Sequence, residues 1–324
     1  MRVPCNIIAI FLFALSAYPQ TNVQTAGKET NYIGVSVVSK TGDFILGLAA
    51  ENFSLFENGR PQSITDFVVN EPACVGILLD TSATFEFFDY QKFAALLGQD
   101  LRYAKPEDEL VLIAFNETQS VLLDRTSDSG EKAAGVDRIS YLVSKGHTKL
   151  YDSIEFALGK LAESKYRKKA LIVLTDLDDN ASKVKSSSVK ESIKNSDVQF
   201  YGIGMKIHRL HDSDRIPAGR DPDPLDPAIM MDQIWLEQFT GLSDVSGGLF
   251  FRAKDYAELG TALRQIIMDM DRQYLIGFRN SGGGKVAEWR KVEIKLDPRR
   301  IPDIKKVGPN IRVRKGYYLP AISK

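Results

Sequence analysis

Residues 77–85 read ILLDTSATF, in which an apolar run stops at an aspartate and three hydroxyl side chains follow. The apolar start of this segment is typical of a buried strand. Asp80 comes next, and then Thr81, Ser82 and Thr84, so that oxygen ligands crowd into five positions. Two interpretations remain open from this segment alone. Either the polar residues cap the following helix, or they bind a cation.

The segment belongs to a long stretch, about 75–270, in which apolar strand-like runs alternate with amphipathic helical patterns. Runs such as VGILLD, ELVLIAF, KKALIVLTD and VQFYGIG have the character of buried strands. Apolar residues recur at helical spacing between them, for example at Leu150, Ile154, Ala157, Leu158 and Leu161. This alternation predicts an α/β fold, doubly wound, with a mostly parallel sheet and helices on both faces.

Two features modify this simple pattern. Only residues 116–119 separate LVLIAF from SVLL, which is too short for a parallel crossover, so the second run is predicted to be an antiparallel edge strand. Residues 207–232 are rich in Pro, Gly and Asp and predict an inserted loop. Capping boxes are predicted at Ser188 and at Asp255, each with glutamate three residues later.

The sequence is strand-like on both sides of the α/β stretch. Residues 29–72 contain short alternating runs around turns such as ENGRP, and residues 272–320 contain YLIGF, WRKVEIKL and NIRVRKGYYL. We therefore predict one small all-β domain formed by both chain ends, with residues 73–271 inserted in it. Two separate β appendages are the alternative.

Charge and the N-terminus bear on partners and location. The 42 basic residues balance the 42 acidic ones, so no overall field attracts nucleic acid or an acidic membrane. Arg2 precedes the apolar stretch IIAIFLFALSAY, which is too short to span a membrane and is followed by polar residues. We predict that residues 1–16 are a signal peptide. The mature protein would then be secreted or periplasmic, with no membrane span and with Cys74 as its single thiol, unable to form an internal disulfide.

Oxygen-bearing side chains are predicted to meet at one edge of the sheet. In an open α/β sheet, ligands bind outside the carboxyl ends of the strands. Asp80 and Asp176 each end an apolar run, and Thr148 lies on a glycine-containing loop directly before a helix. Hard oxygen ligands without imidazole or thiolate favour Mg²⁺, Ca²⁺ or Mn²⁺. A cation with few anionic ligands could accept a carboxylate from a partner protein.

These residues resemble the metal-ion-dependent adhesion site of von Willebrand factor A (VWA) domains, which combines D-x-S-x-S with a distant threonine and a distant aspartate. The sequences on both sides are similar to the VWFA-related Acidobacterial domain family of secreted bacterial proteins. The resemblance implies a VWA domain at 73–271 and a divalent cation, most readily Mg²⁺, with Ca²⁺ or Mn²⁺ as alternatives. The implied ligands are Asp80, Ser82, Thr84, Thr148 and Asp176.

The sequence departs from this pattern at three positions. Thr84 stands where serine is usual, and Ala83 and Leu177 stand where glycine is common. The hydroxyl group is kept at Thr84, with an added methyl group.

The resemblance implies a secreted, non-enzymatic binding or adhesion module that engages an acidic group on a partner protein through the cation. The alternative is a structural or assembly scaffold that binds its partners without metal. An enzyme is the least favoured class. A nucleophilic Ser82 would need a histidine base, and no G-x-S-x-G motif surrounds it. The only histidines are His147, His208 and His211, and the last two are expected on a surface loop.

Overall fold

A six-stranded sheet forms the centre of the α/β part of the molecule. The computed structural model describes residues 30–205, 227–280, 287–301 and 304–319. The strands of this sheet are β5 (Ala73–Asp80), β6 (Glu109–Phe115), β7 (Gln119–Thr126), β8 (Lys168–Thr175), β9 (Val198–Met205) and β10 (Phe250–Ala253). Their order is β10-β9-β8-β5-β6-β7. Neighbouring strands are parallel except for β7, which pairs antiparallel with β6, as the short connection predicted.

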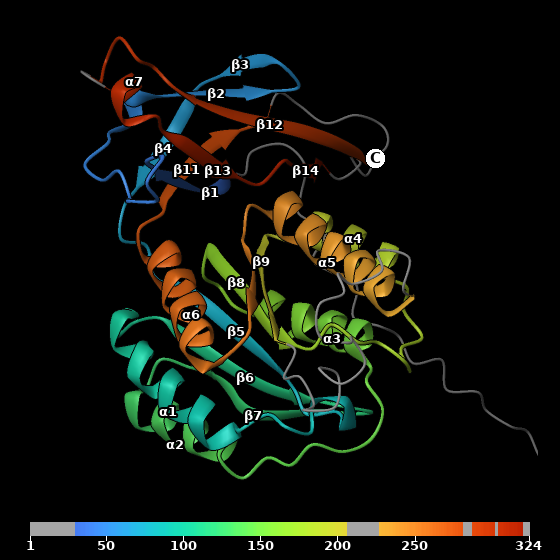
Figure 1. The fold of residues 1–324 in the computed structure, drawn as a ribbon. Coiled ribbons are helices and arrows are strands. Elements are labelled where there is room, and N and C mark those ends of the chain that lie inside the picture. Colours follow the sequence, from blue (N-terminus) through green and yellow to red (C-terminus); the bar gives the residue numbers. More distant parts are fainter. Residues whose placement is uncertain (1–29, 206–226, 281–286, 302–303, 320–324) are drawn as a thin grey trace, which may run out of the picture.

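Helices cover both faces of this sheet (Figure 1). On one face lie α1 (Tyr90–Asp100), α2 (Ser129–Ile139) and α6 (Tyr256–Asp271), whose buried side chains share a core with Ile77 and Leu79 of β5. On the other face lie α3 (Leu150–Ala162), α4 (Ser186–Asn195) and α5 (Pro227–Ser246), which share a core with Leu78. Successive β5 residues therefore enter opposite cores, and the predicted doubly wound α/β arrangement is confirmed.

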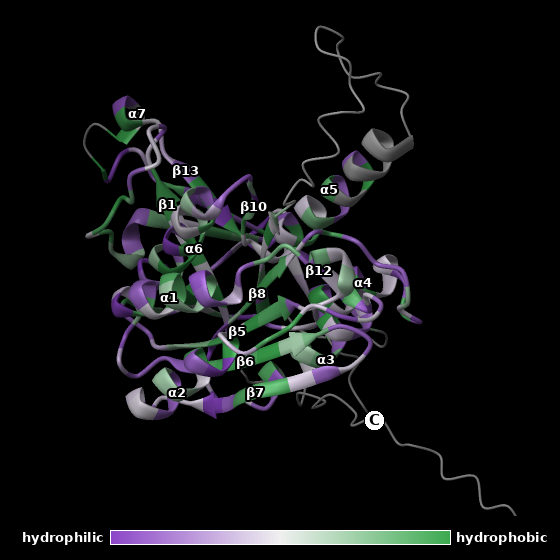
Figure 2. Ribbon diagram, turned by 60° about the horizontal axis from the view of Figure 1, so that its bottom comes forward, coloured by the Kyte–Doolittle hydropathy of each residue, from purple (hydrophilic) through white to green (hydrophobic). Residues whose placement is uncertain are grey.

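Burial on both faces explains why the central strands are apolar throughout. A strand with one wet face would alternate between apolar and polar residues, whereas a strand covered on both faces has no polar side. Figure 2 shows β5, β6 and β8 coloured as hydrophobic along most of their length. Cys74 lies in β5, fully buried, and burial raises the pKa of its thiol to about 12, so it behaves as a small apolar side chain.

Two helix predictions need correction. The inserted loop does not extend through residue 232, because α5 begins at Pro227, and the remaining part of the predicted loop lies outside the described residues. Ser188 does not cap a helix, because α4 already begins at Ser186. The predicted cap at Asp255 is confirmed. Its carboxylate accepts the Glu258 backbone N–H at 2.8 Å, and the Glu258 carboxylate in turn accepts the N–H of Lys254 at 2.9 Å.

Eight further strands form two four-stranded sheets beside the α/β part. They are β1 (Thr30–Val38), β2 (Phe53–Glu57), β3 (Arg60–Gln62), β4 (Ile64–Val68), β11 (Tyr274–Arg279), β12 (Glu288–Leu296), β13 (Asn310–Val313) and β14 (Gly316–Leu319). The sheet orders are β13-β1-β11-β4 and β14-β12-β2-β3, so each sheet contains strands from both sides of the α/β stretch. The short helix α7 (Ile304–Val307) precedes β13, and three single-turn helices complete the described elements: η1 (Ala50–Asn52), η2 (Ala83–Phe85) and η3 (Leu101–Tyr103).

The two smaller sheets share a third apolar core. Its buried side chains are Ile33, Val35, Val37, Tyr274, Ile276 and Phe278 from one sheet, and Phe53, Leu55, Val292, Ile294, Tyr317 and Leu319 from the other. In Figure 1 these strands lie together above the α/β part. Residues distant in sequence therefore pack side by side, and we refer to this region as the β part.

A buried acidic side chain connects the β part to the α/β part. Asp269 of α6 is fully buried and accepts hydrogen bonds from Ser36 and Tyr201, both at 2.7 Å. It also forms an ion pair with Arg312 of β13. Since a buried carboxylate is stable only when it is paired and hydrogen-bonded, these contacts fix α6 against both parts.

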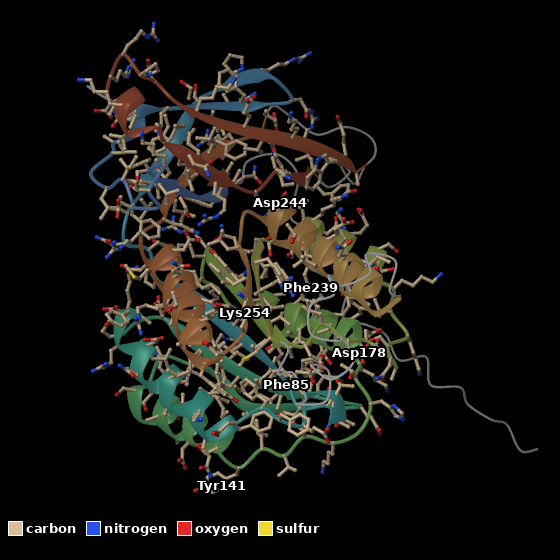
Figure 3. All side chains as sticks on the ribbon, in the orientation of Figure 1. Phe85, Tyr141, Asp178, Phe239, Asp244 and Lys254 are labelled. Atoms are coloured by element: carbon tan, nitrogen blue, oxygen red, sulfur yellow. The ribbon has the colours of Figure 1, made fainter. Side chains whose placement is uncertain are left out.

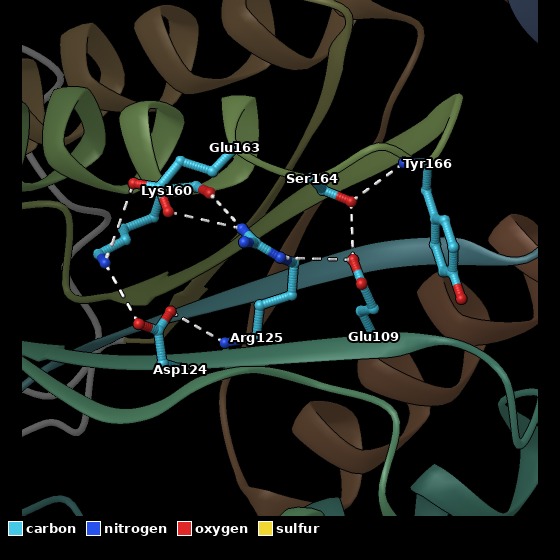
Figure 4. Close-up of polar contacts among 7 residues, drawn as sticks. All are labelled: Glu109, Asp124, Arg125, Lys160, Glu163, Ser164 and Tyr166. Atoms are coloured by element: carbon cyan, nitrogen blue, oxygen red, sulfur yellow. Dashed lines mark hydrogen bonds and ion pairs between the residues drawn. The ribbon is translucent and has the colours of Figure 1, made fainter. Parts of the chain in front are cut away.

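The antiparallel edge strand is held by a chain of ion pairs at the surface (Figure 4). Arg125 of β7 lies 3.8 Å from the Glu109 carboxylate and 3.7 Å from that of Glu163. Lys160 of α3 lies 3.4 Å from Asp124. Partly exposed pairs of this kind each contribute little to stability, but together they fix the register of β7 against α3. In the part of the chain that the structure describes, no helix is long and apolar enough to cross a membrane.

Candidate functional site

Three loops meet at the carboxyl end of the six-stranded sheet. They are residues 81–89 after β5, residues 140–149 before α3, and residues 176–185 after β8. Because parallel strands end at the same edge, the polar side chains that follow β5 and β8 come together there.

Asp80 is the most buried member of this group. Its side chain has no exposed surface. One carboxylate oxygen accepts the Ser82 hydroxyl at 2.6 Å and the Ser82 backbone N–H at 2.9 Å, and the other accepts the Thr175 hydroxyl at 2.7 Å. The aspartate is thereby fixed in one orientation at the end of β5.

Hydroxyl groups continue from Asp80 toward the surface. Ser82 Oγ lies 3.0 Å from Thr84 Oγ1, which lies 3.4 Å from Thr148 Oγ1. Ser82 and Thr148 are fully buried, whereas Thr84 is exposed. The cluster is therefore open to solvent on the Thr84 side.

The alternative that these hydroxyls cap the following helix is wrong. Helix α1 is capped by Asp89, whose carboxylate accepts the Lys92 backbone N–H at 2.9 Å. Ser82 precedes only the single turn of η2, and its side chain makes no capping hydrogen bond. Asp80, Ser82 and Thr84 contact one another, and the Thr81 hydroxyl donates to the Phe115 carbonyl at 2.8 Å, so none of these side chains caps a helix.

Asp176 follows β8 and contributes the second carboxylate. One of its oxygens accepts the Asp178 backbone N–H at 3.0 Å. Burial, together with the negative charge of Asp176, raises the pKa of Asp80 to about 7, although hydrogen bonds from Ser82 and Thr175 oppose the shift. A negative charge close enough to raise the pKa of a buried carboxyl group is an unfavourable interaction that a cation between the two groups would relieve.

The position of Thr148 depends on residues that the sequence did not point to. Its backbone N–H donates to the Asn180 side chain at 2.9 Å, and its carbonyl accepts the N–H groups of Asn180 and Ala181. Asp179 accepts the Leu150 N–H at 2.9 Å and so satisfies the start of α3. These side chains lock the loop after β8 to the loop before α3. Their only sequence signal was their place shortly after Asp176.

Glycine is required in the loop before Thr148. Gly146 has φ +74°, and a Cβ there would lie 2.9 Å from the Glu117 carboxylate. Its carbonyl accepts the N–H of Ala83 at 2.9 Å, which joins this loop to η2. A larger residue would strain the backbone and displace the loop from the site.

Leu177 occupies a left-handed conformation, with φ 73°. Its side chain is buried in the core beneath α4 and α5, within 3.0 Å of the position that a Cβ on Gly204 would take. Its backbone N–H donates to the Thr175 hydroxyl at 3.1 Å, which donates to Asp80. The departure from glycine therefore places a leucine in the core, turned away from the hydroxyl cluster.

The remaining sequence candidates do not assemble a catalytic site among the described residues. His147 is exposed, and its backbone N–H donates to Glu117 at 3.0 Å. His208 and His211 lie outside the described residues. Within residues 30–205, 227–280, 287–301 and 304–319, no group of three or more His, Cys, Asp or Glu side chains that could hold a metal ion comes together.

The donor set fits a hard divalent cation. The structure brings Asp80, Ser82, Thr84 and Thr148 into contact and places Asp176 close enough to perturb Asp80. All five supply oxygen, two as carboxylates and three as hydroxyls, which suits Mg²⁺, Ca²⁺ or Mn²⁺. Figure 3 labels Phe85, which directly follows Thr84, and Asp178, which is two residues after Asp176. That these five residues bind a cation stays a prediction.

Solved structures with a similar fold include VWA domains. A von Willebrand factor type A structure from Catenulispora acidiphila is 11% identical over 92% of this chain and 76% of that chain, with a TM-score of 0.48. The vWF domain of the type V pili tip protein Mfa5 from Porphyromonas gingivalis is 13% identical over 63% and 96%, with a TM-score of 0.44. The conserved hypothetical protein BatB from Bacteroides thetaiotaomicron is 19% identical over 61% and 98%, with a TM-score of 0.44.

No protein-family model matches the sequence, and no curated protein matches it. At identities of 11–19%, what this chain shares with these solved structures is the fold. In fold, the chain is similar to von Willebrand factor A domains.

Proposed function

We propose that this protein is a secreted, non-enzymatic binding module that holds a divalent cation at Asp80, Ser82, Thr84, Thr148 and Asp176. The cation would engage an acidic group on a partner protein. The observation that carries the proposal is the fully buried Asp80 carboxylate, bonded to the Ser82 hydroxyl, from which a line of hydroxyls leads to exposed Thr84.

The charge of the site supports a partner carboxylate. A divalent cation carries two positive charges, and the hydroxyl ligands add no negative charge to the site. Asp80 and Asp176 therefore neutralise the ion only when both are ionised. The open side lies at Thr84, where a ligand from outside can approach. An acidic group from a partner would complete the coordination shell there and would be held by direct attraction to the ion.

The proposal includes export and a domain arrangement. Residues 1–16 would be removed as a signal peptide, which would place the mature protein in the periplasm or outside the cell. The β part, formed by 29–72 and 272–320, would be one domain that carries the VWA domain 73–271, with its cation site at the sheet edge.

A scaffold that acts without metal is the second candidate. One observation favours it: both oxygens of Asp80 accept hydrogen bonds from protein groups, so the aspartate has partners even without an ion. In this case the hydroxyl cluster would only stabilise the loops.

Isothermal titration with Mg²⁺ and with Mn²⁺ separates the two candidates. We expect heat of binding in the wild type and none in Asp80→Ala or Asp176→Ala, because each leaves a single carboxylate for the ion. Asp137→Ala is the matched control, since Asp137 is an exposed aspartate on α2 and its loss should leave binding unchanged. Absence of heat in the wild type would support the metal-free scaffold. Unchanged binding in Asp80→Ala would place the ion elsewhere.

A further inference from the structure

The loop before α3 presents the most exposed large apolar side chains of the described structure. Tyr141 is 76% exposed and Val143 is 70% exposed. Apolar side chains exposed singly need no explanation, whereas these two are only two positions apart in one short loop, and we refer to them together as the apolar patch. Figure 3 shows Tyr141 at the outer edge of the molecule, on the side of Phe85 and away from the β part.

This loop is built into the candidate cation site. The Ser144 hydroxyl contacts Tyr90, whose own hydroxyl donates to the Asp80 carbonyl at 3.1 Å. The Lys145 N–H donates to the Thr81 carbonyl at 2.9 Å. Val143 directly precedes these anchors, so its Cα lies at most about 7.6 Å from that of Lys145.

The same anchors fix the backbone that directly follows the exposed side chains. The Ser144 hydroxyl also donates to the Phe85 carbonyl at 2.9 Å, and Phe85 is buried in the core under η2. A loop held by several hydrogen bonds to a packed element loses little conformational entropy when a partner binds. The backbone that carries the apolar patch is therefore already ordered for contact.

The charge of the loop matches an acidic partner. Residues 140–149 contain Lys145 and Lys149 and no acidic residue, although the Glu117 carboxylate lies against this loop and accepts the His147 N–H. Lys145 is exposed. A segment that combines a carboxylate with a nearby apolar side chain fits this surface, since the basic charge attracts it and the patch buries its apolar group.

We propose that Tyr141 and Val143 form a docking surface for an apolar side chain of the same polypeptide segment whose carboxylate binds the cation. This inference rests on the proposed function, and it defines the partner as an acidic peptide segment with leucine or phenylalanine within a few residues of the aspartate or glutamate. Specificity among acidic partners would come from this surface, because the cation itself recognises any carboxylate.

Two pools of short capped peptides test the proposal on the full-length protein. Both pools carry one central aspartate; the flanking positions are leucine and phenylalanine in the first pool and serine in the second. Retention on immobilised protein is compared in Mg²⁺ and in EDTA. We expect the wild type to bind the apolar pool about tenfold more tightly, a difference of about 1.4 kcal/mol.

Two double variants provide the comparison. In Tyr141→Ser with Val143→Ser the preference for the apolar pool should disappear, while the Mg²⁺ affinity measured alone stays unchanged. Leu46→Ser with Val69→Ser removes two similarly exposed apolar side chains, 57% and 51% exposed, from loops of the β part. This control should keep the preference.

The outcomes separate this inference from the proposed function. A preference that survives in the Tyr141/Val143 variant, or retention of neither pool by the wild type, overturns the docking surface. A preference that is lost in that variant but is equally strong in EDTA contradicts the role of the cation and leaves the docking surface standing. Binding to phosphatidylglycerol vesicles, or self-association in sedimentation, that depends on Tyr141 and Val143 would replace the peptide by a lipid surface or a second copy.

Discussion

At the scale of single residues, Leu177 shows two opposing effects at one position. A left-handed backbone costs a leucine about 1–2 kcal/mol, because its Cβ crowds the carbonyl oxygen. Burial of the side chain in a packed core is worth more, since truncation of a buried leucine costs about 2–5 kcal/mol. Leu177 is 7% exposed, so the second effect is nearly complete. The structure therefore tolerates the strain in exchange for core packing.

We predict that Leu177→Gly lowers the free energy of unfolding by about 1–3 kcal/mol, although it relieves the backbone. Asn70→Gly is the matched control, because Asn70 also has a positive φ, 59°, but is exposed. Its effect should stay within about 0.5 kcal/mol. Urea unfolding measures both. Equal or higher stability in Leu177→Gly would show that strain outweighs packing here.

The residues brought together at the candidate site were predictable from their order in the sequence, but the residues that hold them in position were not. Asp80, Ser82 and Thr84 are close because they are close in sequence after one strand, and Asp176 ends the adjacent strand. The side chains of Asn180 and Asp179, in the loop after β8, accept the backbone N–H groups of Thr148 and Leu150. Such contacts depend on loop conformation, which hydrophobic periodicity does not determine.

At the scale of elements, strand prediction was reliable where apolar runs were long and continuous. The antiparallel β7 followed from the length of its connection, and α6 from its cap at Asp255. Helix α5 was missed because the Pro- and Asp-rich sequence before it was assigned to a loop as a whole. Its signals were present, however, since Phe239, Leu242 and Val245 recur every three residues and are buried, and Pro227 is at the first helical position.

Lys168, at the start of β8, connects three elements through a buried ammonium group. It is 5% exposed and donates to the carbonyls of Glu71 and Met270, which lie before β5 and at the end of α6. Burial, with a further contribution from Lys105, lowers the pKa of Lys168 from 10.5 to about 8, while Asp108 and Asp271 oppose the shift. The charged form is therefore disfavoured in the fold.

This depressed pKa predicts a gain of stability with rising pH. Below about pH 8 the lysine is charged in both the folded and the unfolded chain, so the cost of burying its charge is fully present. Between about pH 8 and 10.5 the folded chain releases its proton first, and the free energy of unfolding rises. Over this range the wild type should gain up to about 3 kcal/mol relative to Lys168→Met, which cannot titrate.

Urea unfolding at a series of pH values tests this prediction. The comparison is best made between pH 7.5 and 9.5, because tyrosines whose pKa is raised by burial, such as Tyr90 and Tyr317, reduce stability at higher pH. Parallel curves for the wild type and Lys168→Met would show that Lys168 keeps an ordinary pKa in the folded protein.

At the scale of the whole molecule, strand-like sequence on both sides of the α/β stretch predicted that the two ends of the chain form strands together. The contacts that join the β part to the α/β part were not predicted. Each sheet of the β part contains strands from both ends, which pattern alone suggested. The polar contacts of Asp269 could not be predicted from the sequence, because a single aspartate in an amphipathic helix is usually solvated. Three of its partners, Ser36, Tyr201 and Arg312, are more than 40 positions away in the sequence.

We predict that Asp269→Ala destabilises the protein by about 3–5 kcal/mol, because it leaves the Arg312 guanidinium without its buried partner. Asp244→Ala is the matched control. Asp244, labelled in Figure 3, also bridges a helix to the C-terminal strands, with Lys315 at 2.9 Å, but both side chains are about 60% exposed. Its loss should cost less than about 1 kcal/mol. Thermal and urea unfolding measure both, and similar losses in the two variants would contradict a special role for Asp269.

In the function proposed for this protein, the three loops at the sheet edge hold a cation between them. Anomalous diffraction from crystals soaked in Mn²⁺ tests this most directly, because the ion is located independently of any partner. We expect one strong peak bounded by the hydroxyls of Ser82 and Thr84, near Thr148, with Asp80 and Asp176 bound directly or through water. A peak elsewhere, or none at this edge in crystals that take up Mn²⁺ at other positions, would contradict it.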